Sequence, residues 1–383
     1  MENPTVQDIF HSFYLKYLDR YTPSAEQAKV SHCIMNCKTG AYGANVSVCE
    51  DCGHLQIHYN SCRNRCCPMS QALPTEKWMD AQREDVLEAP YFHVVFTVPQ
   101  ELNPLIYCNQ KLLYDALYHS VSSTINELAE DEKYLGAKVG YICILHTWGS
   151  EMNFHPHIHV ILLGGGLTAK NQWRDKGEEF FFPVKVLSKL FRGKYLDELK
   201  TLWKNKKLHF HGSSEKYRNH YAFKELINIC YEKDWIPHCK KAFNGAQSVI
   251  HYLGKYIHRI AISNRRIIRM DENTVTYYVK DYREAGKWKA LTIPGVEFIR
   301  RFLMHVPPKR FVRIRHYGLL CTRSKTKHLT LCRNLLGCRQ YLSRLKNMET
   351  AQILETLYGI KVSVCKCCGG HLGKPQQRIP LRI

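Results

Sequence analysis

The sequence predicts an α+β protein whose central sheet is largely antiparallel. Two runs rich in β-branched and aromatic residues, 138–148 and 157–163, are separated by only eight turn-like residues. So short a connection favours an antiparallel pair. Predicted strands and helices follow one another in no strict βαβ order, which is typical of α+β domains. The length of 383 residues predicts two or three domains.

The N-terminal part of the chain begins with a predicted helix and a cysteine-rich unit. Residues 4–18 carry apolar side chains at roughly helical spacing, and a loop-rich metal-binding unit is expected to follow, up to residue 82. Residues 91–99 form a β-branched and aromatic run that ends at a proline, and residues 103–132 show a helical pattern. We therefore expect a strand followed by a long helix.

The sequence patterns that predict the remaining elements are weaker, except for one helix. A polar insertion at 170–240 is expected to contain at least one helix, and residues 246–262 place their apolar side chains on one helical stripe. Strand-like runs at 274–282 and 310–320 indicate that the last third of the chain is folded.

The net charge of +21 points to a polyanionic partner, and most of the excess lies in the last third. Residues 259–383 contain 26 lysines and arginines but only 7 acidic residues. A hydrophobic content of 45% argues against a disordered basic protein. Neither an apolar stretch of membrane-spanning length nor a signal peptide is visible. A cytoplasmic location is therefore expected.

The sharpest local motif is the sequence His-Pro-His-Ile-His at 155–159. In a strand, His157 and His159 point to one face, where two imidazoles about 7 Å apart along the chain can chelate a divalent ion. The first candidate for a third ligand is His146, and the alternatives are Glu151 and Gln247. Manganese, zinc and magnesium all remain open. The alternative is that the histidines are structural.

Tyr252 and Tyr256 are four residues apart in the predicted helix at 246–262, which places both phenols on one face. Tyrosines in such a stripe are usually core residues. The functional interpretation is that they are nucleophiles, because a tyrosine hydroxyl can attack a phosphodiester whose charge a metal ion withdraws.

Cysteines gather at both ends of the chain. In a chain without export signals, such groups indicate metal ligation rather than disulfides, with redox or unliganded thiols as the alternative. The predicted ligands, enough for one structural zinc ion or two, are Cys37, Cys49, Cys52, Cys62, Cys66 and Cys67. The C-terminal group Cys365, Cys367 and Cys368 is interpreted as half of another site, with Cys332 and Cys338 as its candidate partners.

The basic last third interleaves cations with aromatic and apolar residues, a pattern that favours nucleic-acid contact over a merely solvated face. The predicted DNA-binding residues are Arg259, Arg265, Arg266, Arg313 and Arg315.

Together these motifs resemble the two-tyrosine HUH transposases of bacterial rolling-circle insertion sequences that bear an N-terminal zinc-binding domain. The matching text includes CEDCGHLQIHYNSCRNRCCP, LHTWGSEMNFHPHIHVILLGGGL, VIHYLGKYIHRIAIS and CKCCGG. The resemblance implies an HUH endonuclease domain with a central antiparallel sheet flanked by helices. With it, we expect a zinc-binding domain at 1–82, the nuclease domain at 88–264 and a basic DNA-binding region at 265–383.

One departure from the family pattern concerns zinc. Such proteins usually read RHCPxCQ where this chain reads RCCPMSQ, so Cys66 replaces a histidine and Ser70 replaces a cysteine. Serine is a poor zinc ligand. Either His32 or Cys33 compensates, or one metal site is lost.

The resemblance implies a transposase that cuts and transfers single-stranded DNA through a covalent 5′-phosphotyrosine, with Mg²⁺ or Mn²⁺ at the histidines and structural Zn²⁺ in the N-terminal domain. DNA ends and target DNA are the expected partners, in a nucleoid-associated protein that could form a homo-oligomer. A plasmid relaxase or replication initiator would share the chemistry. A non-catalytic zinc-dependent DNA-binding regulator is the alternative of another class.

Overall fold

The computed structural model describes residues 3–177, 182–242, 261–281 and 286–378, together with Gly254 and Glu284. Its helices are α1 (Val6–Leu18), α2 (Ala25–Met35), α3 (Ala72–Arg83), α4 (Asn103–Cys108), α5 (Gln110–Glu130), α6 (Val184–Lys204), α7 (His220–Glu232), α9 (Gly295–Met304), α10 (Lys325–Leu336) and α11 (Thr350–Tyr358). Its strands are β1 (Ala44–Val48), β2 (Leu55–Tyr59), β3 (Tyr91–Thr97), β4 (Lys138–Trp148), β5 (Phe154–Leu167), β6 (Trp173–Asp175), β7 (His238–Ala242), β8 (Ile267–Met270), β9 (Thr274–Asp281), β10 (Lys287–Pro294), β11 (Ile314–Gly318) and β12 (Gln376–Arg378).

The α+β class with antiparallel sheets is confirmed. The central sheet has the order β11-β4-β5-β3-β7, with β6 paired to β5, and two three-stranded sheets have the orders β12-β1-β2 and β10-β9-β8. Neighbouring strands in all three sheets are antiparallel. No helix among the described residues is both long enough and apolar enough to cross a membrane.

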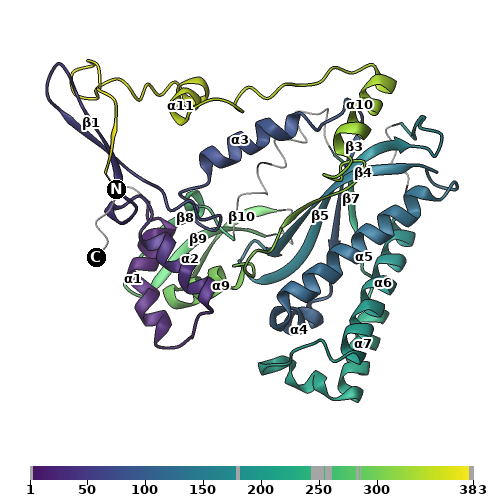
Figure 1. Cartoon of the computed structure of the whole chain (residues 1–383). Coiled ribbons are helices and arrows are strands. Elements are labelled where there is room, and N and C mark those ends of the chain that lie inside the picture. Colours follow the sequence, from purple (N-terminus) through teal and green to yellow (C-terminus); the bar gives the residue numbers. More distant parts are fainter. Residues whose placement is uncertain are drawn as a thin grey trace.

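The two faces of the central sheet have different coverings. Figure 1 shows α5 and α6 along one face, and the side chains of Ile158, Val160 and Leu162 pack into the apolar core beneath these helices. On the opposite face, Ile161 and Leu163 pack against residues of α10, including Leu329. Because strand side chains alternate, the face opposite α5 and α6 also receives His157 and His159.

Strand β5 is longer than the run 157–163 expected from the sequence, because its three glycines continue the strand. A Cβ atom at Gly165 would come within 2.4 Å of the Trp173 ring, and one at Gly166 within 2.4 Å of the Lys138 carbonyl oxygen. Glycine thus allows β4 and β6 to approach β5 closely at this end.

The helix expected at 103–132 is divided into α4 and α5 at Asn109. This residue has a non-helical backbone with φ −126° and ψ 36°. Its side-chain amide donates hydrogen bonds to the carbonyl oxygens of Leu105 at 2.9 Å and His209 at 2.7 Å. Asn109 therefore connects the break between α4 and α5 to the segment that follows α6 by a hydrogen bond.

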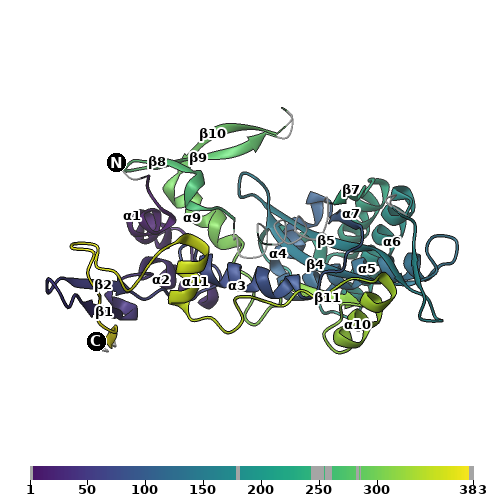
Figure 2. The ribbon, with the colours of Figure 1, turned by 90° about the horizontal axis from the view of Figure 1, so that it is seen from above.

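Described elements that are far apart in the sequence pair and pack together. Strand β11 is the edge strand of the central sheet beside β4, and β12 pairs with β1 near the N-terminus. Helix α9 packs on α1, where Phe10 and Phe302 meet edge to face at 5.4 Å. The excess of basic over acidic residues begins at residue 259. Contacts between the elements, however, are determined by strand pairing and apolar burial. Figure 2 shows β8–β10 and α9 near α1 and α2, away from α5 and α6.

After α10 the chain runs back along α3 (Figure 1), and we call residues 338–349 the strap. Asp80 of α3 holds it, since this carboxylate accepts hydrogen bonds from Tyr341 Oη at 2.6 Å, Ser343 Oγ at 2.6 Å and the Leu345 N–H at 2.8 Å. Burial opposes ionisation, yet the hydrogen bonds from Ser343 and Tyr341 leave the Asp80 pKa below its usual value. The buried carboxylate is thus the anchor of the strap.

Replacing Asp80 by alanine is expected to lower the free energy of unfolding by about 3 kcal/mol, because buried charge-assisted hydrogen bonds are lost. A lowered carboxyl pKa stabilises the fold above the unfolded-state pKa, and this stabilisation is lost as the pH falls through the folded-state pKa. Urea unfolding at several pH values should therefore show a weaker acid dependence for Asp80→Ala. The control is Glu88→Ala at an exposed position. Equal stability of the two variants would contradict the anchoring role.

Candidate metal centre

Strand register brings the three predicted histidines together. His146 of β4 lies directly opposite His157 of β5, and Ile144 lies opposite His159. Directly opposed residues in an antiparallel pair share a face, and His159 shares the face of His157 because it is two residues further along the strand. The ring nitrogens that the three histidines offer all lie within 4.8 Å of one another.

The hydrogen bond of the His157 ring leaves a nitrogen lone pair on the side of the ring that faces His159. His157 Nδ1 lies 2.7 Å from the His155 carbonyl oxygen, so it must donate there, and Nε2 then carries the lone pair. The Nε2 atoms of His157 and His159 are 3.0 Å apart. Two ligands about 2.1 Å from a metal ion, at a right angle, stand about 3.0 Å apart. The donor set therefore fits a divalent cation.

Burial keeps the His157 and His159 rings neutral, as metal ligation requires. It lowers the pKa of His157 to about 4 and lowers the pKa of His159 well below its usual value. His155 changes in the same direction, since burial lowers its pKa too. At neutral pH, the His157 and His159 rings can thus offer lone pairs without first losing a proton.

His93 of β3 is a further member of the cluster that sequence reasoning missed. Its ring stacks on the His159 ring with centroids 5.1 Å apart, and its Nε2 lies 2.9 Å from His159 Nδ1. A metal-bound histidine usually donates its second N–H to an acceptor that orients the ring. We assign this donation to His159 and the acceptor role to His93. The available signal was a polar residue within an otherwise apolar predicted strand.

Of the two alternatives for the third ligand, Glu151 is not in this group. Glu151 is exposed, and its carbonyl oxygen accepts hydrogen bonds from Tyr277 Oη and Arg301. Gln247 lies outside the described residues. His146 is only 3% exposed and stacks on Trp148 with ring centroids 4.6 Å apart. Among the described candidates, His146 therefore has the geometry of a third ligand.

The predicted nucleophiles Tyr252 and Tyr256 lie outside the described residues, as does Arg259. Gly254, between the two tyrosines in sequence, is described. A Cβ atom there would come within 1.8 Å of Met79 Sδ, so Gly254 lies directly against α3.

The predicted zinc ligands separate into different places. Cys37, Cys62 and Cys67 have their sulfur atoms within 4.8 Å of one another. Thiol hydrogen bonds from Cys62 and Cys67 lower the pKa of Cys37 to about 3, and the same contacts raise the pKa of Cys67. Three sulfurs sharing protons in this way fit a thiolate-binding cation such as Zn²⁺, which would displace those protons.

Ser70 stands beside this three-sulfur group, because its Oγ lies 3.7 Å from Cys62 Sγ. Cys66 does not join the group. The turn closed by the Cys67 N–H and the Asn64 carbonyl directs Cys66 into the apolar core. Cys33, which instead receives a hydrogen bond from Tyr42 Oη at 3.5 Å, is also absent from the group, as is His32.

Cys49 and Cys52 form a separate group with Cys365 and Cys368. The partners expected for the C-terminal cysteines, Cys332 and Cys338, were therefore wrong. These two residues instead contribute to the apolar core around α10.

The predicted DNA-binding arginines have different surroundings. Arg315 forms an ion pair with Asp115, and its guanidinium carbon lies 4.0 Å from the centroid of the Tyr118 ring. Arg313 is partly buried, and burial lowers its pKa. Arg265 is exposed, and Arg266 lies over the Tyr277 and Trp288 rings. Arg315 and Arg266 thus both have partners within the fold, Arg266 also donating to the Tyr278 carbonyl oxygen at 2.8 Å, whereas Arg265 lies exposed at the surface.

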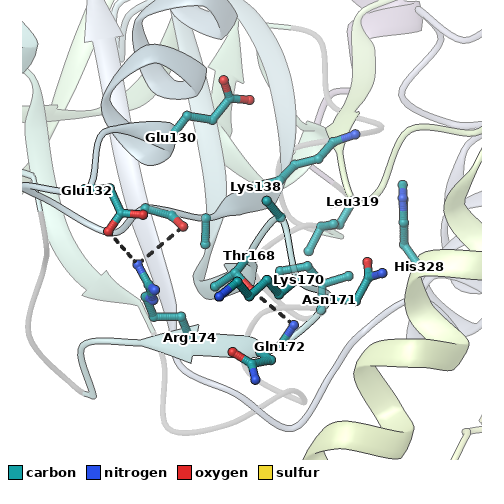
Figure 3. A pocket seen from close by; sticks show the side chains of 14 residues that line it. Glu130, Glu132, Lys138, Thr168, Lys170, Asn171, Gln172, Arg174, Leu319 and His328 are labelled. Atoms are coloured by element: carbon teal, nitrogen blue, oxygen red, sulfur yellow. Dashed lines mark hydrogen bonds and ion pairs between the residues drawn. The ribbon is translucent and has the colours of Figure 1, made fainter.

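A polar cavity of about 590 Å³ lies at the far ends of β4 and β5 (Figure 3). Its lining includes Lys138, the first residue of β4, whereas His146 lies eight residues further along the strand, about 26 Å away. Arg174 in the wall forms an ion pair with Glu132 at 3.3 Å. This cavity is therefore separate from the histidine cluster.

Two sequence models of known families match the chain. One is described as "Putative transposase" and matches residues 140–328, and the other is described as "Transposase zinc-binding domain" and matches residues 9–98. The "Putative transposase y4qJ" of Sinorhizobium fredii (strain NBRC 101917 / NGR234) is 39% identical over 336 residues, which cover 87% of this chain and 84% of that protein. The chain belongs to this transposase family. The family expected from the motifs is confirmed.

A second relative of this transposase is the "Transposase for insertion sequence element IS801" of Pseudomonas savastanoi pv. phaseolicola. It is 28% identical over 299 residues, covering 76% of this chain and 69% of that protein.

Among solved structures, the conjugative relaxase TrwC in complex with oriT DNA is 12% identical in its metal-free form, with a TM-score of 0.25 over 43% of this chain and 69% of that chain. The metal-bound form is 14% identical, also with a TM-score of 0.25, over 52% and 69% of the two chains. The zinc-binding match and the cysteine groups support structural zinc in this transposase.

Replacing His93 by glutamine is expected to weaken Mn²⁺ binding by the transposase about 10- to 100-fold, because an acceptor that orients His159 is altered. Isothermal titration of the full chain with Mn²⁺ measures this directly. The matched control is His11→Gln on the exposed face of α1. If both variants bind Mn²⁺ as the unmodified chain does, His93 does not orient a metal ligand.

Proposed function

We propose that this transposase is a metal-dependent nuclease and strand transferase that acts on single-stranded DNA ends of an insertion sequence and moves it by rolling-circle transposition. The observation that supports the proposal most is the convergence of His146, His157 and His159 on one face of the central sheet. Three converging imidazoles in a protein of the transposase family are suited to a divalent ion at a phosphodiester.

The metal-site residues have distinct tasks in this proposal. His146, His157 and His159 would hold Mg²⁺ or Mn²⁺, which when bound withdraws charge from the scissile phosphate. The His155 carbonyl oxygen and His93 orient the His157 and His159 rings through their Nδ1 atoms. Strand pairing holds these groups in place before substrate arrives, so little reorganisation is needed.

The tyrosines would carry the covalent step. The phenolic oxygen of Tyr252 or Tyr256 loses its proton and attacks the phosphorus, forming an oxygen–phosphorus bond while the bond to the 3′ oxygen breaks. The products are a 5′-phosphotyrosine and a free 3′-hydroxyl. The second tyrosine would repeat the step on another strand. Attack by a 3′-hydroxyl on the phosphotyrosine then rejoins DNA and releases the phenol, so no external energy source is needed.

A surface for single-stranded DNA is offered by the β8–β10 sheet. Along β9, Tyr277 and Val279 are buried, whereas Tyr278 and Lys280 alternate with them and are exposed. Trp288 of β10 lies opposite Lys280 in the register and is 55% exposed. Exposed aromatic rings beside cations are the usual means of stacking bases and holding phosphates without reading sequence. We therefore place the single strand on this face.

This surface adjoins the histidine strand pair. Arg266, whose guanidinium lies over Trp288, donates to the Ser150 carbonyl oxygen at 2.5 Å. The Lys280 N–H donates to Ser150 Oγ, also at 2.5 Å. Ser150 belongs to the connection between β4 and β5, which leads to His157. A strand stacked on Trp288 is thus held next to the segment that carries the metal ligands.

The covalent step is tested by incubating the full chain with Mn²⁺ or Mg²⁺ and a labelled single-stranded element end. A denaturant-resistant adduct is expected, and Tyr252→Phe/Tyr256→Phe should abolish it, because neither phenol remains to attack. The control is Tyr221→Phe on α7, a residue that is 81% exposed. As much adduct from the double variant as from the unmodified chain would eliminate the mechanism. Tight duplex binding without any adduct would support a non-catalytic regulator.

The DNA surface is tested by fluorescence anisotropy with a labelled single-stranded oligonucleotide at several salt concentrations. Trp288→Ala should weaken binding about tenfold, since one base–aromatic stack contributes about 1–3 kcal/mol. Arg265→Gln should reduce the slope of log K against log salt by about 0.7, because one phosphate contact is lost. Tyr221→Ala is the control. If Trp288→Ala binds as tightly as the control, the strand does not lie on β8–β10.

A further inference from the structure

Four cysteines from the two ends of the chain form one compact sulfur cluster. Cys49 and Cys52 follow β1, whereas Cys365 and Cys368 precede β12, and all four Sγ atoms lie within 4.8 Å of one another. Cys49 Sγ is 3.5 Å from Cys368 Sγ, and Cys52 Sγ is 3.8 Å from Cys365 Sγ. Disulfide sulfurs are about 2.05 Å apart. Sulfurs about 2.3 Å from a tetrahedral zinc ion stand about 3.8 Å apart, which matches this cluster.

The two cysteine pairs lie on two separate turns that have the same pattern of backbone hydrogen bonds. In the first, the Gly53 N–H donates to the Cys49 carbonyl at 3.0 Å, and the Cys49 N–H donates to the His54 carbonyl at 2.9 Å. In the second, the Gly369 N–H donates to the Cys365 carbonyl at 3.0 Å, and the Cys365 N–H donates to the Gly370 carbonyl at 2.8 Å.

Each turn depends on a glycine after its second cysteine. Gly53 has φ 69° and Gly369 has φ 77°, values that only glycine adopts readily. N–H groups also point at the sulfurs of the second turn, since those of Cys367 and Gly370 donate to Cys365 Sγ at 3.3 Å and Cys368 Sγ at 3.4 Å. Such bonds stabilise thiolates rather than thiols. Both turns thus present two sulfurs each, and in the second turn N–H groups favour the thiolate form.

Strand pairing brings the two turns together. β12 pairs antiparallel with β1, which pairs with β2, and isolated bridges join Cys49 to Leu372 and Val364 to His371. Figure 1 and Figure 2 both place the C-terminal segment beside the β1–β2 hairpin. Cys49, Cys365 and Leu372 form a buried apolar cluster of their own. The small sheet therefore has little core besides the sulfurs, which is the situation in which a structural metal contributes to folding.

We propose that Cys49, Cys52, Cys365 and Cys368 bind one structural zinc ion that clamps the C-terminal segment onto the N-terminal hairpin. This zinc site is separate from the group of Cys37, Cys62 and Cys67. When zinc is bound, it would hold the end of the segment after α10, and Asp80 holds the strap earlier in the same segment. The proposal does not depend on the nuclease activity.

The test measures zinc content by mass spectrometry in the full chain, after dialysis against a competing chelator. Cys52→Ser and Cys368→Ser should each contain one zinc ion fewer than the unmodified chain. The double variant should lose no more than either single variant, since both residues serve one ion. The matched control is Cys367→Ser, because Cys367 lies between two ligands but outside the cluster. Loss of a second zinc ion in the double variant, or full zinc content in Cys368→Ser, would overturn the proposal.

A second measurement covers the case in which the serine variants fail to fold. Cys368→His keeps a side chain that binds zinc, so the folded chain should retain its zinc content. With Co²⁺ in place of zinc, its thiolate-to-metal absorption should be weaker and shifted relative to the unmodified chain. An absorption spectrum identical to that of the unmodified chain would show that Cys368 is not a ligand.

Discussion

The register between β4 and β5 is the constraint on which the site depends. His146 lies opposite His157, and the alternation along β5 brings His159 to the same face. A slip by one residue would turn the β5 histidines toward the core beneath α5 and α6, where Ile158 and Val160 now pack. The register is held from both sides, because Ile161 and Leu163 are buried on the histidine face. Apolar packing on both faces of β5 thus determines whether the histidines converge.

Local patterns in the sequence were enough for strands β3, β4, β5, β9 and β11 and for the histidine pair, but not for the shorter strands or for contacts between distant segments. His157 and His159 could be assigned to one face because a strand has a period of two. His93 could not be assigned to them, since it is 66 residues away from His159 and reaches it only through the pairing of β3 with β5. The same holds for Cys365, which was given the wrong partners because Cys52 is 313 residues away.

Counting charges predicted the partner class better than it predicted the contact residues. Arg315 counts fully toward the basic excess, yet Asp115 and the Tyr118 ring already surround its guanidinium. Glu297 similarly holds Arg300 and Arg301 within α9, and those hydrogen bonds lower its pKa to about 2. Which cations remain available to a ligand depends on the fold. Strands β11 and β12, both within the basic last third, belong to two different sheets.

The pairing of β12 with β1 also matters for the order in which the chain is made. A ribosome adds about 5–20 residues per second, so the β1–β2 hairpin emerges on the order of tens of seconds before the strand that completes its sheet. Throughout this interval the nascent hairpin has an unpaired edge and two exposed thiols, which makes it open to pairing with another chain. The small sheet can therefore be completed only after β12 has been synthesised.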